Sequence, residues 1–238
     1  MFFNIIFYSF LAGGATLLGV FLLLWQESWT RKNTTLLVSF SAGVLISAAL
    51  AHLIPEAIEL SSSAFLFTLG GFLIFYLLEN LIMFHSCTEE GCPTHIFGLT
   101  SAVGLGFHSL VDGIAIGVGF EVSMEVGIIA TLAVLLHELP EGIATLSILF
   151  QAGIEKEKAL LYSFGVALAT PLGAILILLL GKIFSRNILG ILLAIAAGSF
   201  LYVAASDLIP QTHKKFSPKN VFFFVLGVIF IYLVKIYF

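Results

Sequence analysis

Long hydrophobic stretches recur along the whole chain and are separated by short polar connections. A helix needs roughly 20 apolar residues to cross the hydrocarbon core of a bilayer. Eight stretches approach or exceed that length, with approximate bounds 2–25, 36–59, 64–84, 98–120, 125–150, 157–181, 188–209 and 219–238. Lipid offers the backbone no hydrogen-bond partners, so spanning segments form helices or closed barrels. The pattern therefore predicts an all-α polytopic membrane protein with eight transmembrane helices, in which residues 1–238 form a single transmembrane domain.

The composition supports this fold class, because 60% of the residues are hydrophobic and only 10% are charged. No ordinary soluble domain has that balance. The segment Met1–Trp25 lacks the basic region and the cleavage site of a signal peptide, so we expect it to be retained as the first span. No segment resembles a nucleotide-binding loop, and we expect neither an organic cofactor nor a nucleic-acid partner.

The basic residues of the connections predict the orientation, because cytoplasmic loops carry an excess of Lys and Arg. If the N-terminus is outside, the inner connections hold seven basic residues, which are Arg31, Lys32, Lys156, Lys158, Lys214, Lys215 and Lys219. The outer side then holds three, which are Lys182, Arg186 and Lys235. Both termini are therefore expected to be extracytoplasmic, with a cytoplasmic polar loop at about residues 85–97.

A repeat relates two distant parts of the chain. Residues 41–56 align without a gap onto residues 196–211, at an offset of 155 positions. The identical positions of the first copy are Ala42, Gly43, Ala49, Leu53, Ile54 and Pro55. The copies lie in the second and seventh stretches, which cross the membrane in opposite directions. The match predicts an inverted 3+2+3 repeat of the kind found in transporters, and chance similarity among apolar residues is the alternative.

A polar motif occurs twice, in the fourth and the fifth stretch. The motif H-x-L-x-[D/E]-G-I-A begins at His108 and again at His137. Histidines and carboxylates are costly inside lipid and usually mark a transport pathway or a metal site. Imidazole nitrogen and carboxylate oxygen also suit zinc, iron(II) and manganese(II). The duplication therefore predicts metal or proton handling within the membrane, and a static structural site is the alternative.

The spacing within the motif brings ligands together. Positions i and i+4 share a helix face, so His108 lies with Asp112, and His137 lies with Glu141. Because the two helices are antiparallel neighbours, their polar faces can meet and supply two imidazoles and two carboxylates to one ion.

A second position is predicted beside the first. Ser109 and Glu138 lie about 100° around their helices from the histidines, and they could share the two carboxylates of the first position. Pro140 has no backbone N–H, so we expect the carbonyl of Leu136 to be free of its helical hydrogen bond beside the site.

Two other classes of function share these residues. The segment His137–Glu141 begins like the H-E-x-x-H motif of zinc proteases, which would make the chain an intramembrane zinc metallohydrolase. However, Glu141 stands where that motif needs its second histidine, and Ser109 replaces the glutamate in the other copy. A proton or non-selective cation pathway through the same polar residues is the remaining alternative.

Polar residues near the ends of the spans predict entry and exit points. His52 and Glu56 lie in the outer half of the second stretch, where a hydrated cation would first be attracted. Asp207, at the inner end of the seventh stretch, is the predicted exit. The polar loop is expected either to capture the emerging ion or to be a plain connection. If it captures the ion, its candidate ligands are His85, Cys87, Cys92 and His95.

The motifs resemble those of the ZIP (Zrt/Irt-like) family of divalent-metal transporters. The matching segments are His108–Gly113, His137–Gly142, His52–Ala57, Ala197–Tyr202 and Asp207–Pro210. The resemblance covers essentially all eight stretches. It implies a binuclear metal centre in spans 4 and 5, extracytoplasmic termini, metal movement into the cytoplasm and, in many members, a homodimer. It also implies a movement of spans 1, 4, 5 and 6 against spans 2, 3, 7 and 8.

The resemblance also assigns the ligands by position. The first metal position comprises His108, Asp112, His137 and Glu141, and the second comprises Ser109, Asp112, Glu138 and Glu141. The family often has H-N-x-P-E-G in the fourth span, where this chain has Ser109, Val111 and Asp112 in place of Asn, Pro and Glu. We therefore expect the second position to be weak or empty. The expected substrate is Zn2+, with Fe2+, Mn2+ and Cd2+ as further candidates, carried across the cell membrane (plasma or inner).

Overall fold

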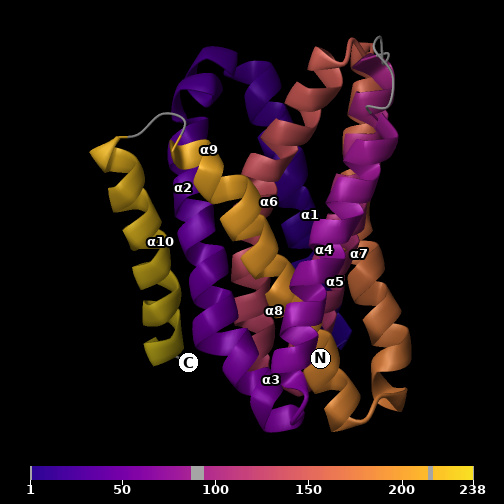
Figure 1. The fold of residues 1–238 in the computed structure, drawn as a ribbon, viewed down its shortest axis with the longest axis vertical. Coiled ribbons are helices and arrows are strands. Elements are labelled where there is room, and N and C mark those ends of the chain that lie inside the picture. Colours follow the sequence, from indigo (N-terminus) through magenta and orange to yellow (C-terminus); the bar gives the residue numbers. More distant parts are fainter. Residues whose placement is uncertain (1, 87–93, 214–216, 238) are drawn as a thin grey trace.

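The computed structural model describes residues 2–86, 94–213 and 217–237, which form helices joined by short turns (Figure 1). In chain order the elements are α1 (Phe2–Trp25), α2 (Glu27–Ala48), the π-helix η1 (Ala49–Leu53), α3 (Ile54–Leu60), α4 (Ala64–Ser86), α5 (Thr94–Val122), α6 (Met124–Gln151), α7 (Lys156–Leu180), the 3-10 helix η2 (Gly181–Ile183), α8 (Arg186–Tyr202), the π-helix η3 (Val203–Leu208), α9 (Ile209–His213) and α10 (Pro218–Tyr237). These described residues contain no strand, which confirms the all-α fold class.

Each of the eight predicted stretches is helical. Six helical segments of the described residues are long and apolar enough to cross a membrane, and two shorter apolar helices are Ala64–Leu78 and Pro218–Val234. The largest difference from the predicted bounds is at α2, which begins at Glu27 and not near residue 36. Hydropathy marks only the lipid-facing part of a helix, whereas the polar residues 27–35 extend the same helix beyond it.

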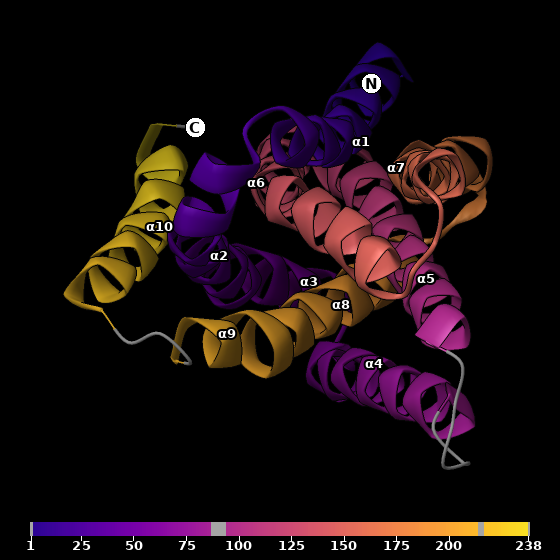
Figure 2. The same cartoon turned by 90° about the horizontal axis from the view of Figure 1, so that it is seen from above.

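The helices form two groups that lie side by side (Figure 2). In the first group, α1, α5, α6 and α7 contact one another. In the second group, α10 packs on α2, α4 packs on α8, and α3 also contacts α8. The groups meet where α2 contacts α6 and where α8 contacts α5. The two central helices of the polar motif, α5 and α6, therefore lie at the boundary between the groups.

The inverted repeat is visible in the backbone. The π-helix η1 covers residues 49–53, and an offset of 155 places those residues within η3, residues 203–208. The N–H of Ile54 donates to the carbonyl of Ala49, and the N–H of Ile209 donates to the carbonyl of Ala204. A proline follows each π-helix, and a π-helical turn relieves the clash between a proline ring and the preceding turn.

The two halves of the repeat also make equivalent packing contacts. Gly43 of α2 lies against the carbonyl of Phe224 in α10, and Gly198 of α8 lies against the carbonyl of Thr68 in α4. The two glycines occupy equivalent positions of the repeat, at the offset of 155. Small residues let helix backbones approach closely in lipid, where helix association depends on packing. These two contacts, of α2 with α10 and of α8 with α4, agree with the predicted relation between the second and seventh spans.

The two ends of the chain lie at the same end of the molecule (Figure 1). An even number of membrane crossings requires this arrangement. The short helix α3 lies at that end too, whereas α4 ends and α5 begins at the opposite end.

Candidate metal centre

The two copies of the polar motif lie on neighbouring helices, α5 and α6, which are joined by Ser123 alone. The Ser123 hydroxyl accepts a 3.2 Å hydrogen bond from the N–H of Val126 and so caps α6. A connection this short makes the two helices antiparallel neighbours, so that their motif faces lie at the same depth.

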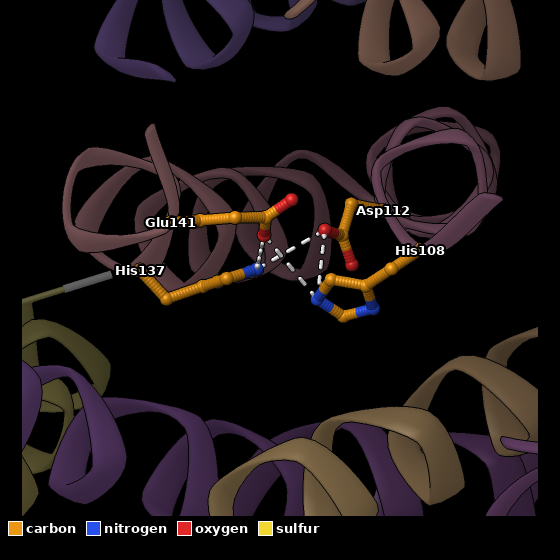
Figure 3. A group of neighbouring side chains, drawn as sticks. All are labelled: His108, Asp112, His137 and Glu141. Atoms are coloured by element: carbon orange, nitrogen blue, oxygen red, sulfur yellow. Dashed lines mark hydrogen bonds and ion pairs between the residues drawn. The ribbon is translucent and has the colours of Figure 1, made fainter. Parts of the chain in front are cut away.

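Four side chains of the motifs converge between α5 and α6 (Figure 3). His137 Nε2 lies 3.0 Å from Asp112 Oδ2 and 3.9 Å from Glu141 Oε2. His108 Nε2 lies 3.4 Å from the same Asp112 oxygen and 3.6 Å from the same Glu141 oxygen. Each residue offers one ligand atom, and all four atoms lie within 4.8 Å of one another. We refer to these four residues as the four-residue centre.

The spacing of the four-residue centre suits a tetrahedral divalent ion. Zinc bonds to histidine nitrogen and carboxylate oxygen are about 2.0–2.2 Å long, which places neighbouring ligand atoms of a tetrahedron roughly 3.4 Å apart. The nitrogen-to-oxygen distances of the centre, from 3.0 to 3.9 Å, fall on both sides of that value. Small side-chain movements would therefore be enough to coordinate an ion.

The four-residue centre is also buried and incompletely satisfied. His108 is 6% exposed, His137 is 2% exposed and Asp112 is fully buried. Among the described residues, neither ring nitrogen of His108 nor Oδ1 of Asp112 has a hydrogen-bond partner. Buried polar atoms without partners are costly, and an ion held by His108 Nε2 would give that nitrogen a partner.

Neighbouring groups fix the orientation of the two imidazoles. The Nδ1 of His137 lies 2.8 Å from the carbonyl oxygen of Ala133, so an Nδ1–H can donate there while Nε2 points into the centre. This is the usual way in which a metal-ligating histidine is oriented. The ring of Phe75 packs edge-on 5.6 Å from that of His108, and the ring of Phe200 lies 5.9 Å from that of His137. These aromatic contacts come from α4 and α8.

The two residues predicted for a second position have different surroundings. The Ser109 hydroxyl donates a 3.0 Å hydrogen bond to Glu141 Oε1, which keeps Ser109 at the edge of the four-residue centre. The carboxylate of Glu138 is fully buried and accepts hydrogen bonds from the hydroxyls of Thr16 and Thr170. Glu138 is not among the four residues whose ligand atoms converge.

Sequence reasoning missed Thr16 and Thr170, although a signal was present. The segment Ala15–Gly19 reads A-T-L-L-G and the segment Ala169–Gly173 reads A-T-P-L-G, at an offset of 154. This offset is close to that of the inverted repeat, and the segments lie in spans 1 and 6, which the repeat relates. A search for a second matching pair of segments would have found both threonines.

The predicted entry residues lie in the second helix group. His52 is 6% exposed within η1, and η1 contacts both α6 and α8. Glu56 is half-buried in α3, within electrostatic range of Glu59, Glu125 and Arg186. The remaining predicted side chains lie outside the residues whose side chains the structure describes, and these are Asp207, His85, Cys87, Cys92 and His95.

The fold and the site together define a polytopic helical membrane protein with a buried group of two histidines and two carboxylates that could hold a metal ion. The family model described as "ZIP Zinc transporter" matches residues 84–235, which is more than half of the chain. The chain belongs to the ZIP zinc transporter family.

Individual relatives show the same likeness. Zinc transporter ZIP13 of Pongo abelii is 28% identical over 212 residues, which cover 80% of this chain and 61% of that protein. Zinc transporter ZIP10 of Danio rerio is 34% identical and Metal cation symporter ZIP14 of Xenopus tropicalis is 37% identical, each over 109 residues that cover 46% of this chain. Those matches span 13% of ZIP10 and 23% of ZIP14, so this chain corresponds to only part of each relative.

Proposed function

We propose that the chain transports divalent metal cations across a membrane into the cytoplasm, with Zn2+ as the main substrate. One observation carries the proposal: a buried centre of two imidazoles and two carboxylates lies at the boundary between two helix groups, in a chain of the ZIP zinc transporter family. His108, Asp112, His137 and Glu141 form the main ion position. Ser109 and Glu138 flank it as a weaker second position.

The path of the ion follows the polar residues. A hydrated cation is attracted near Glu56 and His52, loses water stepwise as the four-residue centre replaces it, and leaves near Asp207. The membrane potential drives inward movement, with roughly 2.3 kcal/mol per charge per 100 mV. Because ligands bind metal only when deprotonated, protonation of the centre on the cytoplasmic side favours release.

The range of substrates extends beyond zinc in this proposal, to Fe2+, Mn2+ and Cd2+. The affinity of most nitrogen and oxygen sites for first-row divalent ions such as Mn2+, Fe2+ and Zn2+ follows the Irving–Williams order, so the geometry of the site decides its selectivity. The name of one relative, metal cation symporter, supports a range wider than zinc.

Three further parts of the proposal concern the setting of the protein. The excess of basic residues in one set of connections supports extracytoplasmic termini in the plasma or inner membrane. The resemblance to the family supports a homodimer. The polar loop, with Cys87 and Cys92, serves to capture the emerging ion and is not needed for the central chemistry.

Uptake by purified protein in proteoliposomes tests the proposal. We expect Zn2+ to enter the vesicles only when protein is present, and a metal analysis to find zinc bound to the purified chain. Charge movement that persists when a chelator removes divalent ions would favour a proton or non-selective cation pathway. Hydrolysis of a lipid or peptide without metal uptake would favour the intramembrane metallohydrolase.

A further inference from the structure

Glu138 is held by side chains from two helices other than its own. Thr170 of α7 donates a 2.6 Å hydrogen bond to Glu138 Oε1, and Thr16 of α1 donates to the other carboxylate oxygen. Both threonines and the glutamate are fully buried. Hydroxyl groups that donate to an ionised carboxylate make stronger hydrogen bonds than neutral pairs do. Both oxygens of the Glu138 carboxylate are thus engaged by protein groups.

Close backbone contacts lock the two threonines in place. The carbonyl of Thr16 lies against Gly142 of α6, and the carbonyl of Thr170 lies against Gly113 of α5, without room for a β-carbon at either glycine. These glycines occupy the same position in the two copies of the polar motif. The positions of the threonine hydroxyls are therefore fixed by the same helix contacts that bring the four helices of the first group together.

The repeat explains why both hydroxyls reach the same carboxylate. Glu138 and Ser109 follow the histidine in their respective motifs, so a symmetric arrangement would pair Thr16 with Glu138 and Thr170 with Ser109. The side chain of Ser109 is short and donates to Glu141 instead. This leaves the hydroxyl of Thr170 free to donate to Glu138.

We propose that Thr16 and Thr170 are positioning residues that hold the Glu138 carboxylate away from the ion, so that the chain binds one divalent ion tightly and disfavours a second. The inference rests on the proposed function and refines its ion centre. For Glu138 to become a ligand, its carboxylate has to turn toward the ion and give up at least one of the two buried hydrogen bonds. The loss of one such bond should weaken binding of the second ion by about tenfold or more, judged from the typical strength of hydrogen bonds to charged groups.

Equilibrium dialysis of the purified chain with Cd2+, followed by metal analysis, tests the inference. We expect the wild type to bind one Cd2+ tightly. The isosteric double variant Thr16→Val/Thr170→Val should bind the second Cd2+ at least tenfold more tightly than the wild type. The double variant Thr16→Ser/Thr170→Ser keeps both hydroxyls and should match the wild type. Adding Glu138→Gln to the valine variant should remove the gain.

Thr131→Val is the matched control, because Thr131 is buried in α6 and donates only to the carbonyl of Gly127 in its own helix. It should bind Cd2+ as the wild type does. Equal second-ion affinity in the valine variant and the wild type would overturn the inference, and so would serine variants that behave like valine variants.

The two Cd2+ affinities of the wild type also test the role of the threonines, even where the valine variants do not fold. A second Cd2+ that binds the wild type within tenfold of the first would overturn the role of the threonines and leave the proposed function standing. A wild type that binds no Cd2+ would instead contradict the proposed function itself.

Discussion

The Ser41 hydroxyl of α2 donates a 2.7 Å hydrogen bond to the carbonyl oxygen of Leu136 in α6. Pro140 has no N–H to offer this carbonyl, as the sequence predicts, and Ser41 takes its place. The bond is a polar link between the two helix groups, at the residue immediately before His137. It shows that the boundary between the groups is specified by polar contacts as well as by apolar packing.

Replacement of Ser41 by alanine should destabilise the protein. The partly buried Leu136 carbonyl would lose its partner, which typically costs about 1–3 kcal/mol. Ser39→Ala is the control, because the Ser39 hydroxyl bonds only to the Thr35 carbonyl of its own helix. Thermal unfolding in detergent should show a lower midpoint for Ser41→Ala than for Ser39→Ala. Equal midpoints would mean that the Leu136 carbonyl finds another partner.

Two neighbouring residues of α5 should differ sharply in their effect on zinc affinity. Asp112→Ala removes a ligand that lies within 3.4 Å of both imidazoles, so zinc binding should be lost. Ser109→Ala removes one hydrogen bond to Glu141, and a loss of about 1 kcal/mol corresponds to roughly a fivefold weaker affinity. Titration calorimetry of both variants measures the difference. A defect in Ser109→Ala as large as that of His108→Ala would show that the second position is essential.

The close contact between α6 and α1 predicts the effect of a single methyl group. Gly142→Ala would place its β-carbon against the carbonyl of Thr16 and force the helices apart, and overpacking of this kind typically costs about 1–3 kcal/mol. Gly14→Ala is the control in α1, because nothing lies within 4 Å of its added β-carbon. The yield of monodisperse protein after heating should fall for Gly142→Ala alone. A Gly142→Ala variant as stable as Gly14→Ala would contradict the packing.

The polar loop offers a test of orientation. Deletion of residues 86–94 should leave zinc uptake largely intact, since the loop ligands lie outside the four-residue centre. Impermeant thiol reagents should label Cys87 and Cys92 from the cytoplasmic side only. Labelling from outside intact cells would overturn both the position of the loop and the extracytoplasmic termini.

The sequence alone predicts the parts of this structure that depend on local periodicity. The i, i+4 spacing in α5 and α6, with the single-residue connection at Ser123, is enough to bring His108, Asp112, His137 and Glu141 together. The repeat of residues 41–56 is likewise enough to relate the second and seventh spans.

The remaining features depend on partners that are distant in the chain. The position of Glu138 relative to the ion depends on Thr16 and Thr170, which lie 122 and 32 positions away. The aromatic rings beside the imidazoles come from α4 and α8, and no local pattern in α5 or α6 points to them. Such contacts follow from how the helices pack, which hydropathy does not determine.

Zinc uptake into proteoliposomes by variants of the four-residue centre tests the central claim most directly. His137→Ala and Glu141→Ala should abolish uptake while the proteins remain folded and inserted, because each removes a ligand from the buried ion position. His213→Ala and Glu157→Ala change the same residue types at exposed positions and should transport zinc at the wild-type rate. Wild-type uptake by a well-folded Glu141→Ala or His137→Ala variant would contradict the assignment of the ion path to this centre.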